Sequence, residues 1–279
     1  MYETIDVQAE SSVATIWLNR PEQHNAFNAV LITELVHACE ALGESESVRV
    51  VVLAGRGRSF SAGGDLNWML QASKLTDEEN LDDARMLARM LKTLACLPKP
   101  TIARVHGAAM GGGLGLTAAC DICVASTGAS FATSEVRLGL IPAAISPYVV
   151  RAIGARQAYR YFQTAERIPA VQAMQLGLVH EVVEPDQLDV KIQALTDALI
   201  EGAPQAQSEA KQLIRSVTET ESMDKIIEET AQRIARIRVA PEAQEGVTAF
   251  LEKRPAAWVA ASLAQASPRS ADPVPGDGS

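Results

Sequence analysis

A glycine-rich corner follows a strand-like run in TIARVHGAAMGGGLGLTAACD, residues 101–121. The apolar run 101–105 is typical of a buried strand. Gly111, Gly112, Gly113 and Gly115 then lead into a predicted helix at 116–119. Glycine has no Cβ, so the backbone can approach a ligand closely, and the free N–H groups at a helix start favour negative charge. The stretch predicts a strand–turn–helix unit whose turn could meet a substrate.

A second glycine corner, SAGGDL at residues 61–66, follows another predicted strand at 48–54. Two backbone N–H groups that converge from separate strand ends are what an oxyanion hole needs. Each corner alone could also be an ordinary turn. The glycines form neither a dinucleotide-binding nor a phosphate-binding motif, and the chain lacks the G-x-S-x-G motif of serine hydrolases.

One carboxylate stands among apolar residues in FATSEVRLGLIP, residues 131–142. An apolar pocket raises the pKa of a carboxyl group by desolvation, which suits it to proton transfer near neutral pH. Glu135 is therefore a candidate acid–base group, although taken alone it could equally lie on a helix surface.

Strands and helices alternate through the first two thirds of the chain. Strands are predicted at 13–18, 48–54, 101–105 and 122–125, and helices at 29–42 and from the capping box of Thr76 and Glu79 to just before Pro98. Four helical segments without a strand between them follow, at 186–200, 204–218, 223–239 and 241–252. We expect a core at 1–200, a helical region at 201–264 that packs on the core or on a neighbouring subunit, and a disordered tail at 265–279, which is rich in Pro, Ser, Asp and Gly.

Composition excludes several classes of protein. The net charge of −9 argues against nucleic acid and anionic membranes as partners. No signal peptide begins the chain and no apolar run reaches the roughly 20 residues of a membrane-spanning helix, so a cytoplasmic location is predicted. Of the four cysteines only Cys120 and Cys123 are close together, and they lack the further ligands of a zinc site, so no metal is expected.

Five stretches in order resemble the signatures of the enoyl-CoA hydratase/isomerase (crotonase) family across residues 1–260. They are NRPEQHNAF at 19–27, the glycine corners at 61–66 and 107–121, SEVRLGLIP at 134–142 and AMQLGLV at 173–179. The resemblance implies an α/β fold, a spiral of ββα units with a helical C-terminal trimerisation region. It also implies an acyl-CoA substrate, assembly as a homotrimer or a dimer of trimers, and no separate cofactor, because coenzyme A is part of the substrate.

The resemblance assigns roles to single residues. Gly64 and Gly112 match the family's two oxyanion-hole N–H groups, and Glu135 matches its proton-transferring glutamate. The backbone that lines the CoA arm corresponds to His24, Ala26, Ala62 and Leu66.

One departure bears on the reaction. Hydratases of the family generally have a second glutamate two residues after the glycine triplet, where this chain has Gly115. With AAISPY at 143–148, which replaces a glycine-rich run, this departure resembles bacterial methylglutaconyl-CoA hydratases of leucine and acyclic-terpene degradation. The implied activity is a lyase that adds water to 3-methylglutaconyl-CoA or the longer isohexenylglutaconyl-CoA, or removes it.

We hypothesise that Gly115 widens the pocket to admit the distal carboxylate of such a substrate, with Arg137 or Arg151 as its partner. Two alternatives stay open. One is a Δ3,Δ2-enoyl-CoA isomerase, which needs a single glutamate. The other is an RNA-binding or structural homologue, against which the net charge and the glycine corners argue.

Overall fold

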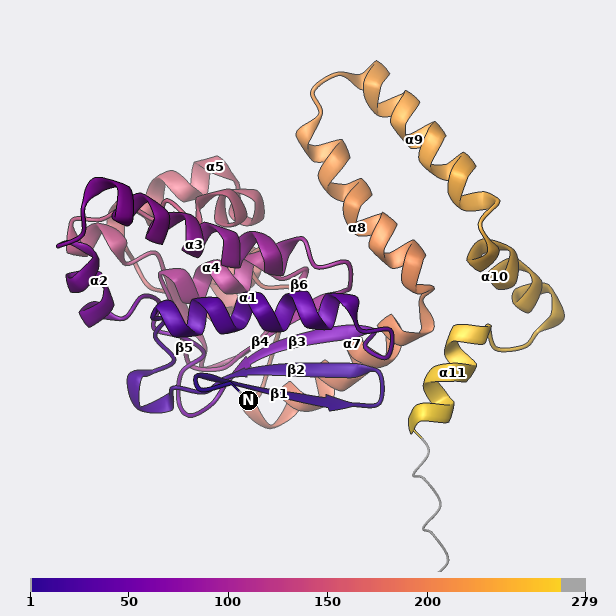
Figure 1. Cartoon of the computed structure of the whole chain (residues 1–279), viewed down its shortest axis with the longest axis horizontal. Coiled ribbons are helices and arrows are strands. Elements are labelled where there is room, and N and C mark those ends of the chain that lie inside the picture. Colours follow the sequence, from indigo (N-terminus) through magenta and orange to yellow (C-terminus); the bar gives the residue numbers. More distant parts are fainter. Residues whose placement is uncertain (1, 267–279) are drawn as a thin grey trace, which may run out of the picture.

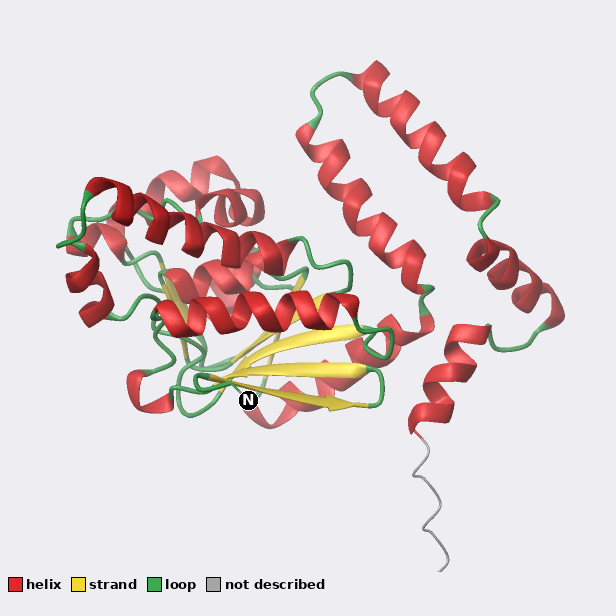
Figure 2. Ribbon diagram, in the orientation of Figure 1, coloured by secondary structure: helices red, strands yellow, loops and turns green. Residues whose placement is uncertain are grey.

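The computed structural model describes residues 2–266, in which a large sheet is sandwiched between helices (Figures 1 and 2). The sheet has the strand order β1-β2-β3-β4-β6-β9; β1 and β2 pair antiparallel and the other strands are parallel. Its strands are β1 (Ile5–Glu10), β2 (Val13–Leu18), β3 (Val50–Gly55), β4 (Thr101–Val105), β6 (Ile122–Ser126) and β9 (Glu181–Val183). The predicted run 101–105 is confirmed as β4.

A second, three-stranded sheet consists of β5 (Ala108–Met110), β7 (Ser130–Ala132) and β8 (Ile168–Pro169). The chain passes from β4 in the large sheet to β5 in the small one through Gly107, whose φ is +62°. It passes likewise from β6 to β7. Because consecutive strands enter different sheets before the next helix begins, the chain winds as the expected ββα units.

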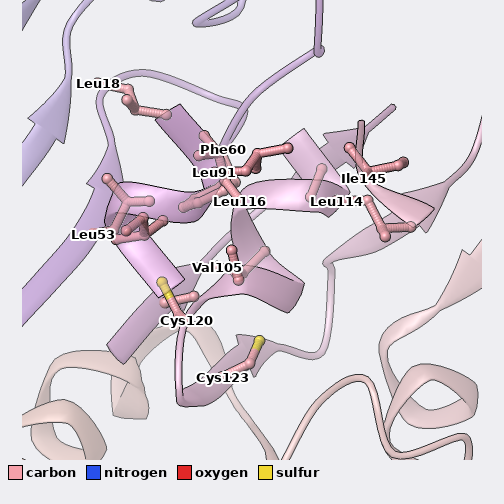
Figure 3. Packing of buried hydrophobic residues seen from close by; sticks show 14 of the residues in the cluster. Leu18, Leu53, Phe60, Leu91, Val105, Leu114, Leu116, Cys120, Cys123 and Ile145 are labelled. Atoms are coloured by element: carbon pink, nitrogen blue, oxygen red, sulfur yellow. The ribbon is translucent and has the colours of Figure 1, made fainter. Parts of the chain in front are cut away.

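Both faces of the large sheet are covered, as the sequence of β3 predicts. Val51 and Leu53 belong to the main core under α1 (Ala29–Glu44), α3 (Asp77–Ala95) and α4 (Gly112–Ala119). Val50 and Val52 point the other way and pack with Leu188 of α7 (Leu188–Glu201). Figure 3 shows the main core at α4, where Leu114 and Leu116 lie among residues of the neighbouring elements.

Local sequence signals fix the helix starts. Thr76 and Glu79 form the predicted capping box at the start of α3: the Glu79 N–H donates to Thr76 Oγ1 at 3.3 Å, and the Thr76 N–H donates to Glu79 Oε2 at 2.9 Å. Four helices were not predicted, namely α2 (Leu66–Ala72), α5 (Ser146–Thr164), α6 (Ala170–Gln175) and α11 (Ala257–Ala266). Short 3₁₀ turns occur at η1 (Pro21–Gln23), η2 (Glu135–Leu138) and η3 (Pro185–Gln187).

The helices that follow α7 form an arm that projects from the body, whereas α7 itself packs on the sheet (Figure 1). The four predicted segments are α7, α8 (Pro204–Glu219), α9 (Met223–Arg238) and α10 (Pro241–Glu252). Lys211 Nζ anchors α8 to the body through Asp121 Oδ2 at 2.7 Å. None of the helices in residues 2–266 is long and apolar enough to cross a membrane.

One boundary of the predicted tail was wrong. A further helix, α11, spans Ala257–Ala266, so residues 265 and 266 continue a helix instead of starting the tail. The stretch AWVAASLAQA is rich in alanine, the strongest helix former, which explains the extension. The rest of the predicted tail, 267–279, lies outside the described residues.

Candidate active site

The two glycine corners are fastened to each other by Ser61, which is fully buried. Its N–H donates to Ala108 O at 3.0 Å, and its carbonyl accepts from the Met110 N–H at 2.9 Å. Its hydroxyl donates to Asn25 O at 2.8 Å and accepts from the Gly63 N–H at 3.2 Å. One residue thus joins the loop after β3 to the strand that enters the second corner.

Gly64 and Gly112, the predicted oxyanion donors, lie at this junction. A Cβ on the preceding Gly63 would stand 3.1 Å from Gly112 N, which shows how closely the corners approach. Within residues 2–266, the N–H groups of Gly64 and Gly112 enter none of the backbone hydrogen bonds at this junction. Both residues line the same two cavities, so both donors are available to a ligand oxygen there.

The glycine at position 112 is required by close packing. A Cβ on Gly112 would stand 2.3 Å from Phe27 Cε2, far inside van der Waals contact. Phe27 itself is buried and its backbone pairs with Gly64 as an isolated bridge. The aromatic ring therefore holds the first turn of α4 against the Gly64 corner.

Glu135 is the first residue of the turn η2, and its carboxyl group lies against the second glycine corner. Its Oε1 lies 3.2 Å from the point where a Cβ on Gly111 would stand. Its Oε2 is buried and has no hydrogen-bond partner in the described part of the chain. Burial raises the pKa of Glu135 above its ordinary value, in agreement with the expectation from its apolar sequence context. A buried carboxyl group with an unengaged oxygen suits proton transfer.

Two cavities meet at these three residues. The acyl cavity, as we name the first, has a volume of about 390 Å³, and the second, the entrance cavity, about 520 Å³. Gly64, Gly112 and Glu135 line both. A thioester whose carbonyl lies at the junction could therefore extend one arm into each cavity.

Three of the four residues predicted for the CoA arm line the entrance cavity: Ala26, Ala62 and Leu66. The fourth, His24, is absent from the residues that line either cavity. Its carbonyl accepts the Ala62 N–H at 2.9 Å, and its ring Nδ1 lies 3.1 Å from Ser59 Oγ. His24 therefore positions the Ala62 backbone, and Ala26 and Ala62 line the entrance cavity in its place.

The acyl cavity is largely apolar, and sequence reasoning missed most of its lining. Its apolar side chains come from β2–α1, α2, α3 and the stretch before α5: Phe27, Trp68, Met69, Ala72, Ala84, Leu87, Leu140, Ile141, Pro142, Ala143, Ala144 and Ile145. Ser73, Asn80 and Asp83 are the polar additions besides Glu135. The T-x-x-E signal located the start of α3, but no local signal shows which face of α2 or α3 meets the substrate.

The hypothesis that Gly115 widens the pocket was wrong. A Cβ on Gly115 would stand 2.1 Å from Ile145 Cγ2, and Gly115 is buried and lines neither cavity. Ile145 fills the volume that the missing side chain leaves. The proposed cationic partners also lie elsewhere: Arg137 lines the entrance cavity, and Arg151 pairs with Glu219 of α8 at 3.1 Å.

Comparison with known proteins identifies the family. The sequence model described as Enoyl-CoA hydratase/isomerase matches residues 8–261. The chain belongs to this family. Similar sequences include the 2,3-dehydroadipyl-CoA hydratase of Escherichia coli (strain K12), which is 34% identical over 89% of this chain and 95% of the relative. The crotonyl-CoA hydratase of Syntrophomonas wolfei is 29% identical over 92% of this chain and 98% of the relative.

Solved structures of related proteins have the same fold as this chain. An enoyl-CoA hydratase from Shewanella pealeana superposes with a TM-score of 0.89 at 44% identity, covering 92% of this chain and 96% of that one. Pseudomonas aeruginosa AtuE superposes with a TM-score of 0.88 at 33% identity, covering 92% and 100%. The predicted α/β crotonase fold is confirmed. The protein is an enzyme of the enoyl-CoA hydratase type, a class that acts on acyl-CoA thioesters.

Proposed function

We propose that this enzyme adds water to a 2-enoyl-CoA thioester, with Glu135 as the group that moves the proton. One observation carries the proposal: Gly64, Gly112 and Glu135 lie together where the acyl and entrance cavities meet. A thioester carbonyl at that point has the enoyl carbons on the side of the acyl cavity and the CoA arm on the side of the entrance cavity.

The reaction follows from this placement. Glu135 takes a proton from water as the water oxygen bonds to C3, and the C2=C3 electron pair moves toward the thioester oxygen. The N–H groups of Gly64 and Gly112 stabilise the resulting enolate, and the loss of one such donor typically lowers the rate by about 10²–10³-fold. Glu135 then returns a proton to C2, so the enzyme ends unchanged. A single carboxylate can perform both transfers when the water and the proton add to the same face of the C2=C3 double bond.

The lining of the acyl cavity bears on which acyl group the substrate carries. The resemblance to methylglutaconyl-CoA hydratases predicts a substrate with a distal carboxylate, and a place in leucine or terpene degradation. A carboxylate that enters an apolar cavity needs a cation or several hydrogen bonds. The described lining of the acyl cavity contains no Lys, Arg or His. The methylglutaconyl substrate stays a prediction, and the cavity lining favours an uncharged acyl group instead.

A second candidate is a Δ3,Δ2-enoyl-CoA isomerase. The observation that favours it is the missing second glutamate. Gly115 stands at that position here, and Ile145 fills the space that a side chain would need. An isomerase needs one base that lifts a proton from C2 and returns it to C4, so Glu135 would suffice.

Mass spectrometry and the ultraviolet absorbance of the conjugated thioester together distinguish these activities, because hydration adds the mass of one water and isomerisation leaves the mass unchanged. We expect crotonyl-CoA and 2-hexenoyl-CoA to gain the mass of one water when incubated with the enzyme. Conversion of 3-hexenoyl-CoA to the conjugated isomer without hydration of 2-hexenoyl-CoA would replace the hydratase with the isomerase. Absence of both reactions would support a non-catalytic role. Adding 3-methylglutaconyl-CoA to the same series tests the finer prediction directly.

We also propose that the C-terminal arm joins subunits into a trimer or a dimer of trimers. Large apolar side chains on α8, α9 and α10 are exposed in the single chain: Ile214, Met223, Ile227, Ile234, Val247, Phe250 and Leu251. An apolar surface of this kind on a projecting arm is typical of a protein interface.

A further inference from the structure

Asp83 is an acidic side chain on the wall of the acyl cavity. It belongs to α3 and is half-buried, and its Oδ1 accepts a hydrogen bond from Trp68 Nε1 at 3.2 Å. Trp68 belongs to α2 and packs against the main core. The hydrogen bond therefore links the two helices that line this cavity, and it keeps the Asp83 carboxylate at the cavity wall.

The charges that face the acyl cavity are all of one sign. Its titratable lining residues, as far as the structure describes them, are Asp83 and Glu135, and its other polar side chains, Ser73 and Asn80, are neutral. Arg85 of α3 pairs with Asp82 on the exposed side of the helix, at 2.8 Å. No cation of α2 or α3 is among the lining residues to offset the two carboxylates.

We propose that Asp83 determines acyl specificity: it makes the cavity select an uncharged acyl chain and reject a chain that ends in a carboxylate. The proposal rests on the hydratase function above and names its substrate class. A substrate carboxylate would lose its hydration in the apolar cavity and would meet like charges instead of a partner. Juxtaposed like charges are an effective means of discrimination between ligands.

Two thioesters of equal chain length test the proposal, 2-hexenoyl-CoA and 2,3-dehydroadipyl-CoA, which differ by the distal carboxylate. We expect the parent enzyme to have a kcat/KM at least about tenfold higher for 2-hexenoyl-CoA. Asp83→Asn is nearly isosteric and keeps an oxygen that can accept from Trp68 Nε1, but it removes the charge. We expect it to shift the ratio of the two kcat/KM values about tenfold toward 2,3-dehydroadipyl-CoA.

Asp82→Asn is the matched control. It makes the same change of charge one residue away on the same helix, but the Asp82 side chain is 65% exposed and absent from the cavity lining. We expect it to leave the ratio unchanged, which separates a local effect from a change in overall charge.

The outcomes are distinct. A parent enzyme that uses both thioesters equally well, or prefers 2,3-dehydroadipyl-CoA, would overturn the role of Asp83 but leave the hydratase function intact. An equal shift in Asp82→Asn and Asp83→Asn would overturn it as well. A parent enzyme that hydrates neither thioester would remove the proposed function itself, and the specificity proposal with it.

Discussion

Ile145 lies so close to Gly115 that a Cβ on the glycine would stand 2.1 Å from Ile145 Cγ2. Ile145 is 2% exposed, and Figure 3 shows it beside Leu114 of the same core. The position at which hydratases of this family generally have a second glutamate is thus closed by packing. Restoring that glutamate would require the core around Ile145 to move.

This packing predicts that Gly115→Ala destabilises the protein. Overpacking of a core by one methyl group costs about 1–3 kcal/mol of unfolding free energy. In the double variant with Ile145→Ala, removal of Cγ2 should relieve part of the conflict. Urea unfolding of the parent, the two single variants and the double variant measures the coupling, which we expect to exceed about 0.5 kcal/mol. Additive effects of the two substitutions would show that the core accommodates both side chains without contact.

Glu135→Gln should remove the activity and leave the fold intact. The amide fills the same volume but exchanges no proton, so we expect a loss of about 10²–10⁴-fold in kcat. The rate of hydration of 2-hexenoyl-CoA measures the effect, and circular dichroism checks the fold. A folded variant whose rate stays within about tenfold of the parent would remove Glu135 from the mechanism.

The pKa of Glu135 predicts two opposite effects of pH. As a base, Glu135 must be ionised, so kcat/KM of the parent should fall as the pH falls through its pKa, which burial raises above 4.5. A carboxyl group with a raised folded pKa contributes its stability at low pH, and this contribution is lost as the pH rises through the folded pKa. Glu135→Gln should therefore be more stable than the parent at neutral pH, and the difference should vanish below pH 4.5. Thermal unfolding of both proteins at several pH values tests the sign.

Gly112→Ala should impair catalysis through its contact with Phe27. The added Cβ would stand 2.3 Å from Phe27 Cε2, so the first turn of α4 must shift and carry the Gly112 N–H away from the thioester oxygen. We expect kcat to fall by about 10²-fold, the lower end of the loss of an oxyanion donor. Gly128→Ala is the control, because a Cβ there would meet nothing within 4 Å. Full activity of a folded Gly112→Ala variant would contradict the oxyanion assignment.

The C-terminal arm should carry the oligomer contacts. Phe250 of α10 is 83% exposed in the single chain, and Phe250→Asp should weaken an interface built on this surface. Size-exclusion chromatography should show a shift of the variant toward the monomer. Val190→Asp, on α7 of the body, replaces another exposed apolar residue and should leave the oligomer unchanged. A native-size oligomer after removal of all residues from Pro204 onward would rule out the role of the arm.

The sequence by itself determined the elements whose signals are local. The apolar run of β4, the capping box of α3 and the helical segments α7 to α10 were all predicted, because periodicity and capping depend on neighbours in the chain. Glu135 and the two glycine corners were found as well, because their signals are also local. Apolar neighbours surround Glu135 in the sequence, and each group of glycines directly follows a predicted strand.

Only the tertiary structure decided how these parts meet. Ser61 joins the two glycine corners through bonds to Ala108, Met110 and Asn25, which lie 36 to 49 positions away. Ile145 fills the space beside Gly115, a volume that we expected from the sequence to be open to substrate. Trp68 and Asp83 come together from helices on one wall of a cavity that no periodicity outlines. A sequence pattern shows that a side chain is buried, but the neighbour that buries it is set by packing between elements distant in the chain.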